Sequence, residues 1–171
     1  MKMPKTFSAD GKLLNIVIET PAGSRNKYAL DAETGLFKLR KILPAGTAFP
    51  LNMGFIPGTK GEDGDPLDAL VWLDFPASVG VFIECRLLGV MEVEQQEKNK
   101  EPERNDRFLF VADASREQKD IRSIHDIAAE KLEEIEEFFK YYNAAEEKQF
   151  HVLGYKKPRV ALSIIKKQMH G

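Results

Sequence analysis

The chain has 171 residues, of which 43% are hydrophobic and 30% charged, and its net charge is −2. This composition is typical of a globular protein, and we expect one domain spanning residues 1–171. Basic and acidic residues are interspersed, which argues against nucleic-acid binding and against attachment to an anionic membrane.

Sequence features that bear on location point to the cytoplasm. Residues 1–12 lack the apolar core of a secretory signal, and no run approaches the roughly 20 apolar residues of a membrane span. Cys85 has no second cysteine with which to form an internal disulfide. The three histidines, His125, His151 and His170, are too scattered to suggest a zinc site.

The first part of the chain shows the short, alternating apolar pattern of β-strands. Strands are expected at residues 16–19, 27–30, 36–41, 54–56, 67–73, 81–93 and 107–111. A turn at residues 31–35 should join the second and third of these into a hairpin. Because many short strands need closure to protect their edges, we expect a closed or nearly closed antiparallel β-barrel.

The rest of the chain is charged and then helical in pattern. Residues 95–106 are expected to form a solvated loop between two strands. Intervals of four and three predict an amphipathic helix, with Ser123 as its candidate N-cap and with an apolar stripe formed by Ala128, Leu132, Ile135, Phe139 and Tyr142. A second helix should begin at Pro158. The sequence therefore predicts an α+β fold that is mainly β, with two C-terminal helices flanking the barrel.

The most informative stretch is the acidic run Asp63-Gly64-Asp65-Pro66-Leu67-Asp68. Its three carboxylates repel one another, and Asp68 lies in a segment with the pattern of a buried strand, where an unpaired carboxylate is costly. A hard divalent cation such as Mg²⁺, which takes oxygen ligands, is the simplest compensation. The alternative is that Asp63-Gly64 forms a hairpin turn and that the acids are solvated.

This acidic run resembles the signature of the soluble, magnesium-dependent inorganic pyrophosphatases of family I. Further matching segments occur in the same order, at residues 18–21, 26–28, 49–56, 88–90 and 138–142. The resemblance implies an OB-like barrel and hydrolysis of pyrophosphate to two phosphates by a metal-bridged water. It also implies Mg²⁺ as cofactor, with Mn²⁺ or Zn²⁺ as substitutes, and a homo-oligomer, often a hexamer in bacteria.

The resemblance assigns roles to individual residues. Metal binding falls on Glu19, Asp63, Asp65 and Asp68. Asp65 is also implied to accept the proton of the attacking water. Binding of the phosphates falls on Lys27, Lys41, Arg107 and Tyr142, with Lys41 in the place of an arginine and Arg107 in the place of a lysine.

Several positions depart from the family pattern. Ala29 stands for a second glutamate, and Phe49 and Met53 stand for two tyrosines. The family has a second acidic loop with one aspartate at its start and another two residues before its lysine, and these two places read Gln95 and Asn105 here. Separately, Asn143 stands for a lysine. Asp106, one residue out of register, is a candidate substitute ligand beside Asn105.

These departures leave two alternatives beside a pyrophosphatase. One is a catalytically impaired relative that binds metal or phosphate, and the other is a hydrolase of a different phosphoanhydride. An oligonucleotide-binding barrel is disfavoured, because the strands lack interleaved aromatic and basic residues.

Overall fold

The structure is a computed structural model that describes residues 2–170. Its strands are β1 (Leu14–Thr20), β2 (Asn26–Leu30), β3 (Phe37–Ile42), β4 (Asn52–Phe55), β5 (Asp68–Trp72), β6 (Phe82–Glu97), β7 (Glu103–Arg104), β8 (Arg107–Ala112) and β9 (Lys148–Lys156). Its helices are the 3₁₀ turn η1 (Ile124–Asp126), α1 (Ala129–Ala144) and α2 (Pro158–Lys167).

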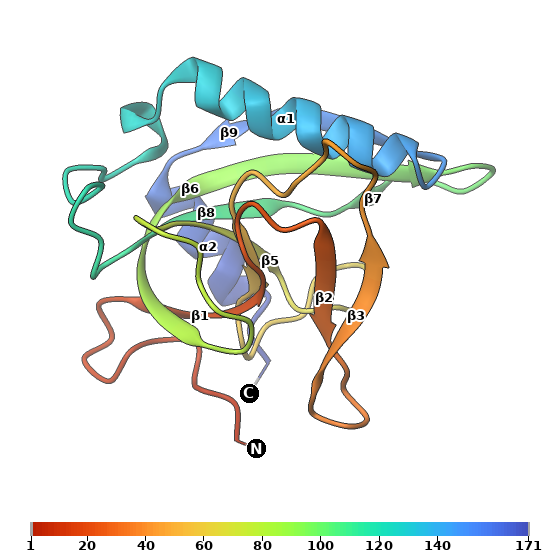
Figure 1. Cartoon of the computed structure of the whole chain (residues 1–171). Helices are drawn as coiled ribbons and strands as arrows, with labels where there is room; N and C mark the ends of the chain where they lie inside the picture. Colours follow the sequence, from red (N-terminus) through yellow and green to blue (C-terminus); the bar gives the residue numbers. More distant parts are fainter. Residues whose placement is uncertain (1, 171) are drawn as a thin grey trace.

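Five strands are paired in a ring. The pairs are β1–β4, β4–β5, β5–β8, β8–β6 and β6–β1, while β7 and β9 extend the sheet from the long strand β6. Strands β2 and β3 form a separate hairpin beside the ring (Figure 1). The expected mainly β fold, with two helices toward the C-terminus, is confirmed.

One pair in the ring is parallel, which corrects the expectation of a wholly antiparallel barrel. Strands β5 and β8 run in the same direction, with Asp68 opposite Arg107. A parallel pair needs a long connection between its strands. Here that connection contains β6 and β7, so the parallel neighbours are distant in the sequence.

Two hydrophobic clusters fill the two faces of the sheet. Successive residues of β8 alternate between them: Phe108 and Phe110 belong to the cluster that includes α2, whereas Leu109 and Val111 belong to the cluster that includes α1. Strand side chains alternate between faces, so a strand covered on both sides is buried throughout, as all six residues of β8 are.

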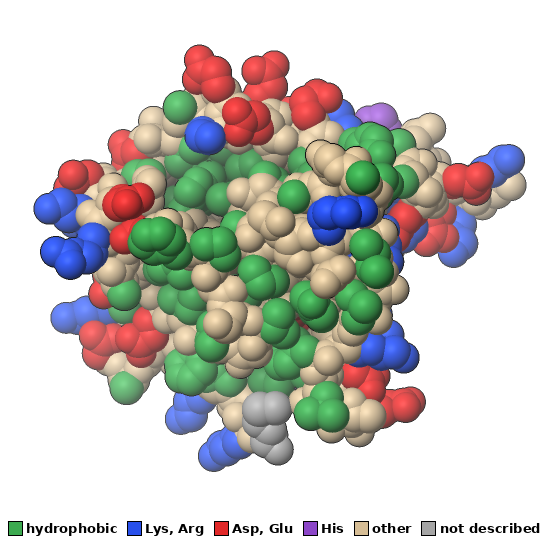
Figure 2. All heavy atoms as spheres, in the orientation of Figure 1, with side chains coloured by type: hydrophobic (Ala, Val, Ile, Leu, Met, Phe, Trp, Pro, Cys, Tyr) green, Lys and Arg blue, Asp and Glu red, His purple; other side chains and the backbone are tan. Residues whose placement is uncertain are grey.

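The two helices bury the faces that the sequence predicts. Helix α1 packs on β9 and buries Ile135, Phe139 and Tyr142, while its acidic side chains lie along the upper edge of the surface in Figure 2. Helix α2 begins at Pro158, as expected, and packs on β6 through Ala161 and Ile165. Among residues 2–170, neither helix has the length and apolar character needed to cross a membrane.

The predicted start of the first helix is wrong. Ser123 caps η1, where its hydroxyl accepts the His125 amide and Asp126 completes a capping box. Ile127 and Ala128 then take extended conformations, so α1 begins only at Ala129. A capping residue marks the start of a helical turn without specifying how far the helix extends.

The predicted loop at residues 95–106 is also partly wrong. Strand β6 continues through Glu97, and β7 pairs back onto it. The physical reason is β9, which the sequence-based prediction lacks. It pairs with β6 as far as Glu97 opposite Lys148 and so satisfies the backbone of a charged segment.

Candidate active site

A cavity of about 850 Å³ opens between β1, the β2–β3 hairpin, the loop at residues 61–67, the outer end of β6 and the last turns of α1. It is lined by Glu19, Lys27, Lys41, Asp63, Asp65, Asp68, Asn105, Arg107 and Tyr142. The structure therefore brings together every residue to which a metal or phosphate role was assigned, except Asp106.

The acidic wall of this cavity comes from β1 and the loop before β5. Glu19 accepts a hydrogen bond from the Leu30 amide at 2.8 Å. The pKa of Glu19 is raised to about 7, mainly by burial and to a smaller extent by the nearby carboxylates of Asp68 and Asp65, which together outweigh that hydrogen bond. In the loop, Asp63 accepts the Asp65 amide at 3.0 Å, and burial raises the Asp63 pKa as well.

The partner of Asp68 is Arg107. The Nη1 of Arg107 lies 2.7 Å from Asp68 Oδ2, across the parallel strands β5 and β8. Burial raises the pKa of Asp68, and the guanidinium lowers it. The same nitrogen donates to the Asn105 carbonyl at 2.7 Å, and the guanidinium lies over the Phe139 ring. The cation that compensates this half-buried carboxylate is therefore present within the protein.

Basic and aromatic side chains also line this cavity. The Nζ of Lys41 lies 3.9 Å from the centre of the Tyr142 ring, and the Nζ of Lys27 lies 5.2 Å from it. The Tyr142 hydroxyl is buried and has no hydrogen-bond partner among the described residues. An unpaired buried hydroxyl beside two ammonium groups is suited to an anionic oxygen.

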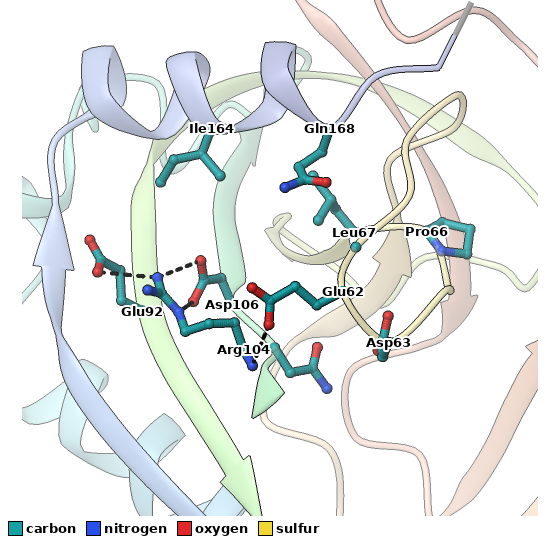
Figure 3. Close-up of a pocket in the computed structure, with 11 residues that line it drawn as sticks. Glu62, Asp63, Pro66, Leu67, Glu92, Arg104, Asp106, Ile164 and Gln168 are labelled. Carbon is teal, nitrogen blue, oxygen red and sulfur yellow. Dashed lines mark hydrogen bonds and ion pairs between the residues drawn. The ribbon is translucent and has the colours of Figure 1, made fainter. Parts of the chain in front are cut away.

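Asp106 lies outside this cavity. It accepts the Val93 amide at 2.9 Å and two hydrogen bonds from the Arg104 guanidinium, at 2.9 and 3.1 Å. Figure 3 shows Arg104 between Asp106 and Glu92 in a second pocket of about 330 Å³, which lies beside α2. Side chains of adjacent extended residues point to opposite faces, so a shift of one residue from Asn105 sends this carboxylate away from the other acids.

The three neutral replacements lie together in the cavity. Gln95, Asn105 and Asn143 all line it, and their amides are hydrogen-bonded to one another. The β6–β7 hairpin also contributes Glu97, Glu101 and Glu103 to the lining.

Comparison with known proteins places this site in a family. The family model described as inorganic pyrophosphatase matches residues 16–171. The inorganic pyrophosphatase of Synechocystis sp. is 36% identical over 153 residues, which cover 90% of this chain and 88% of that protein. The inorganic pyrophosphatase of Streptomyces coelicolor is 40% identical over 132 residues, which cover 77% and 78% of the two chains. The chain belongs to the inorganic pyrophosphatase family.

Solved pyrophosphatase structures share the fold. The inorganic pyrophosphatase of Thermus thermophilus matches with a TM-score of 0.86 and 31% identity, over 98% of this chain and 94% of that one. The Helicobacter pylori inorganic pyrophosphatase matches with a TM-score of 0.86 and 29% identity, over 98% and 96% of the two chains.

Other departures from the family pattern make this pyrophosphatase cavity more apolar. Ala29, Phe49 and Met53 all line it. The Phe49 ring packs on Phe138 and Tyr142, with ring centres 5.1 and 5.8 Å apart. Two positions that carry hydroxyls in the family thus contribute packing beside Tyr142 instead of hydrogen bonds.

Sequence reasoning missed Glu146, which lies among the lysines. Its Oε1 is 2.6 Å from the Lys41 Nζ, and its Oε2 is 3.7 Å from the Lys148 Nζ. These lysines and the neighbouring Lys27 lower the Glu146 pKa against the effect of burial. No sequence pattern pairs residues that are 105 positions apart.

The donor set fits divalent cations in its chemistry. Glu19, Asp63, Asp65 and Asp68 supply hard oxygen donors on one wall of one cavity. Across residues 2–170, no three acidic, histidine or cysteine side chains are gathered closely enough to form a ready-made metal group. Burial is the main cause that raises the pKa values of Glu19, Asp63 and Asp68, and neighbouring carboxylates add to it.

Proposed function

We propose that the protein hydrolyses inorganic pyrophosphate to two phosphates and that Mg²⁺ is its cofactor. The observation that carries this proposal is that one cavity gathers both the acidic and the basic side chains. Carboxylates from β1, β5 and the loop between β4 and β5 line this cavity together with Lys27, Lys41 and Tyr142. The acidic side chains suit divalent cations and the basic side chains suit phosphate oxygens.

The acidic residues of the cavity would bind the cations and accept a proton. Glu19, Asp63, Asp65 and Asp68 would hold the cations, which when bound neutralise the substrate and acidify water. The Asp65 carboxylate would take the proton of the attacking water as a new oxygen–phosphorus bond forms and the bridging phosphorus–oxygen bond breaks.

The basic and aromatic residues would bind the substrate and orient it. Lys27 and Lys41 would pair with phosphate oxygens, and the Tyr142 hydroxyl would donate its unused hydrogen bond. Arg107, which contacts Asp68 directly, would orient that carboxylate at the edge of the phosphate site.

The test is phosphate release from pyrophosphate in the presence of Mg²⁺. Asp65→Asn keeps the shape of the side chain but removes its basicity, so we expect a loss of about 10²- to 10⁴-fold in kcat. Asp120→Asn is the matched control, because Asp120 is exposed and lies outside the cavity. Near-normal turnover by the Asp65→Asn protein would contradict the assignment of the proton acceptor.

Neither alternative function gains support. The relatives named above are all pyrophosphatases, and the predicted acids and cations share one cavity. A wild-type protein that binds phosphate without releasing it from pyrophosphate would favour the impaired relative instead.

We further propose that residues 1–171 act as one cytoplasmic domain that assembles into a homo-oligomer, with a hexamer as the first form to test. Among residues 2–170, Leu36, Ile42 and Phe75 are the most exposed large apolar side chains, and Figure 2 shows hydrophobic side chains across much of one face. Apolar surface of this kind supports self-association. Light scattering during size-exclusion chromatography measures the mass directly.

A further inference from the structure

Three side-chain amides form a continuous hydrogen-bonded chain across the cavity wall. Asn105 Nδ2 donates to Gln95 Oε1 at 2.8 Å, and Gln95 Nε2 donates to Asn143 Oδ1 at 2.9 Å. Asn143 Nδ2 then donates to the Phe139 carbonyl at 2.8 Å. The chain thus joins Asn105, which directly follows β7, to β6, and β6 to the last turns of α1.

Each end of this amide chain adjoins a residue of the site. Asn143 directly follows Tyr142, whose buried hydroxyl lies beside the lysines. At the other end, the backbone carbonyl of Asn105 accepts the Arg107 nitrogen that also pairs with Asp68. Gln95 is the link between these two regions, because it is the residue bonded to both asparagines.

The amide chain carries no charge. Asn143 is only 2% exposed, Gln95 and Asn105 are half-buried, and a hydrogen-bonded network of this kind rigidifies the groups that it connects. A neutral network needs no cation to balance its charge. The spacing between Tyr142 and the Asp68–Arg107 pair is therefore set within the protein.

We propose that Gln95 is a positioning residue of the pyrophosphatase site. Its two amide hydrogen bonds hold the Tyr142 end of α1 at a defined distance from the Arg107–Asp68 pair, so that one substrate reaches both. This inference rests on the proposed function, since it concerns how the same cavity binds and orients pyrophosphate.

The central variant is Gln95→Met, which keeps the length and approximate volume of the side chain but cannot make either amide bond. Gln96→Met is the matched control, because Gln96 adjoins Gln95 on β6, lies outside the cavity and donates to the Lys100 carbonyl. Asn105→Ala removes the hydrogen bond from Asn105 to Gln95 and keeps the one from Gln95 to Asn143. This variant replaces Gln95→Met in the test if Gln95→Met fails to fold.

Two quantities should change. We expect Gln95→Met to raise the KM for pyrophosphate about tenfold and to lower kcat, while Gln96→Met changes neither by more than about twofold. Asn105→Ala should give a smaller loss in the same direction. In a Tyr142→Phe background, Gln95→Met should raise KM by less than about twofold, because the hydroxyl that it positions is already gone.

Equilibrium dialysis of inorganic phosphate in the presence of Mg²⁺ separates this inference from the proposed function. If the wild type binds phosphate but does not hydrolyse pyrophosphate, the proposed function fails, and a tenfold weaker phosphate affinity of Gln95→Met would still support the positioning role. If Gln95→Met only lowers the melting temperature, and its KM, kcat and phosphate affinity equal those of Gln96→Met, the positioning role is overturned. A KM increase of equal size with and without the Tyr142 hydroxyl would also overturn it.

Discussion

Replacing Arg107 by methionine tests whether this arginine compensates Asp68. The guanidinium is the direct partner of Asp68 at 2.7 Å, and its own side chain is only 6% exposed. Methionine fills much of the same space against the rings of Phe139 and Phe150. The main consequence of Arg107→Met is therefore an unpaired carboxylate in β5.

The size of the effect follows from the geometry. Removing one partner of a buried ion pair costs about 3–5 kcal/mol. The Asp68 side chain is 32% exposed, so water solvates part of the freed charge, and we expect a loss of about 2–3 kcal/mol in the free energy of unfolding. For a chain of this size, that corresponds to a melting temperature lower by about 5–10 °C.

The pH dependence gives a sharper test of the same pair. Burial already raises the Asp68 pKa above its ordinary value, and without Arg107 the pKa should rise further. A carboxyl whose folded-state pKa is raised contributes stability below its unfolded pKa and loses that contribution as the pH rises through the folded pKa. The deficit of Arg107→Met should therefore be largest near neutral pH and shrink toward about pH 4.

The assay is thermal unfolding of Arg107→Met, Asp68→Asn and the double variant, without divalent cations. The double variant should be more stable than Arg107→Met at neutral pH, because it removes the unpaired charge. The reasoning is refuted if Arg107→Met melts within about 2 °C of the wild type, or if adding Asp68→Asn recovers nothing.

Three further predictions can be checked by melting curves. Because the Glu19 pKa is about 7, the wild type in EDTA should gain stability as the pH falls from about 8 to about 5. The Glu19→Gln protein should show a weaker dependence of stability on pH. If its pH dependence equals that of the wild type, other groups cause it. Mg²⁺ at about 100 times its Kd should stabilise the wild type by about 2.7 kcal/mol and the Asp68→Asn protein by less, whereas equal stabilisation would exclude Asp68 as a ligand. Gly54→Ala would place a Cβ against the Val17 carbonyl oxygen and should lower the free energy of unfolding by about 3 kcal/mol or more. Gly35→Asn, in open space at φ 72°, should lower it by less than about 1 kcal/mol. Similar melting temperatures of the two variants would show that β1 and β4 can separate.

Local sequence patterns determine a large part of this fold and of its site. Period-two alternation and turn residues locate the β2–β3 hairpin, and Pro158 marks the first residue of α2. The acidic run at residues 63–68 predicts which carboxylates gather in the cavity, because closely spaced carboxylates need compensation wherever the chain places them. These features depend on residues within a few positions of one another.

The remaining features depend on partners that are distant in the chain. Strand β9 forms because β6 offers it an edge, and that pairing turns a charged segment predicted as loop into strand. The parallel pairing of β5 with β8 places Arg107 opposite Asp68, so the compensating cation comes from 39 residues away. Likewise, the alternation of extended residues turns Asp106 toward Arg104, and Asn143 joins Gln95 only because α1 packs over the sheet. Local patterns specify which residues are acidic, basic or apolar, but tertiary packing determines which of them meet, because a side chain's partners are set by the whole set of strand pairings.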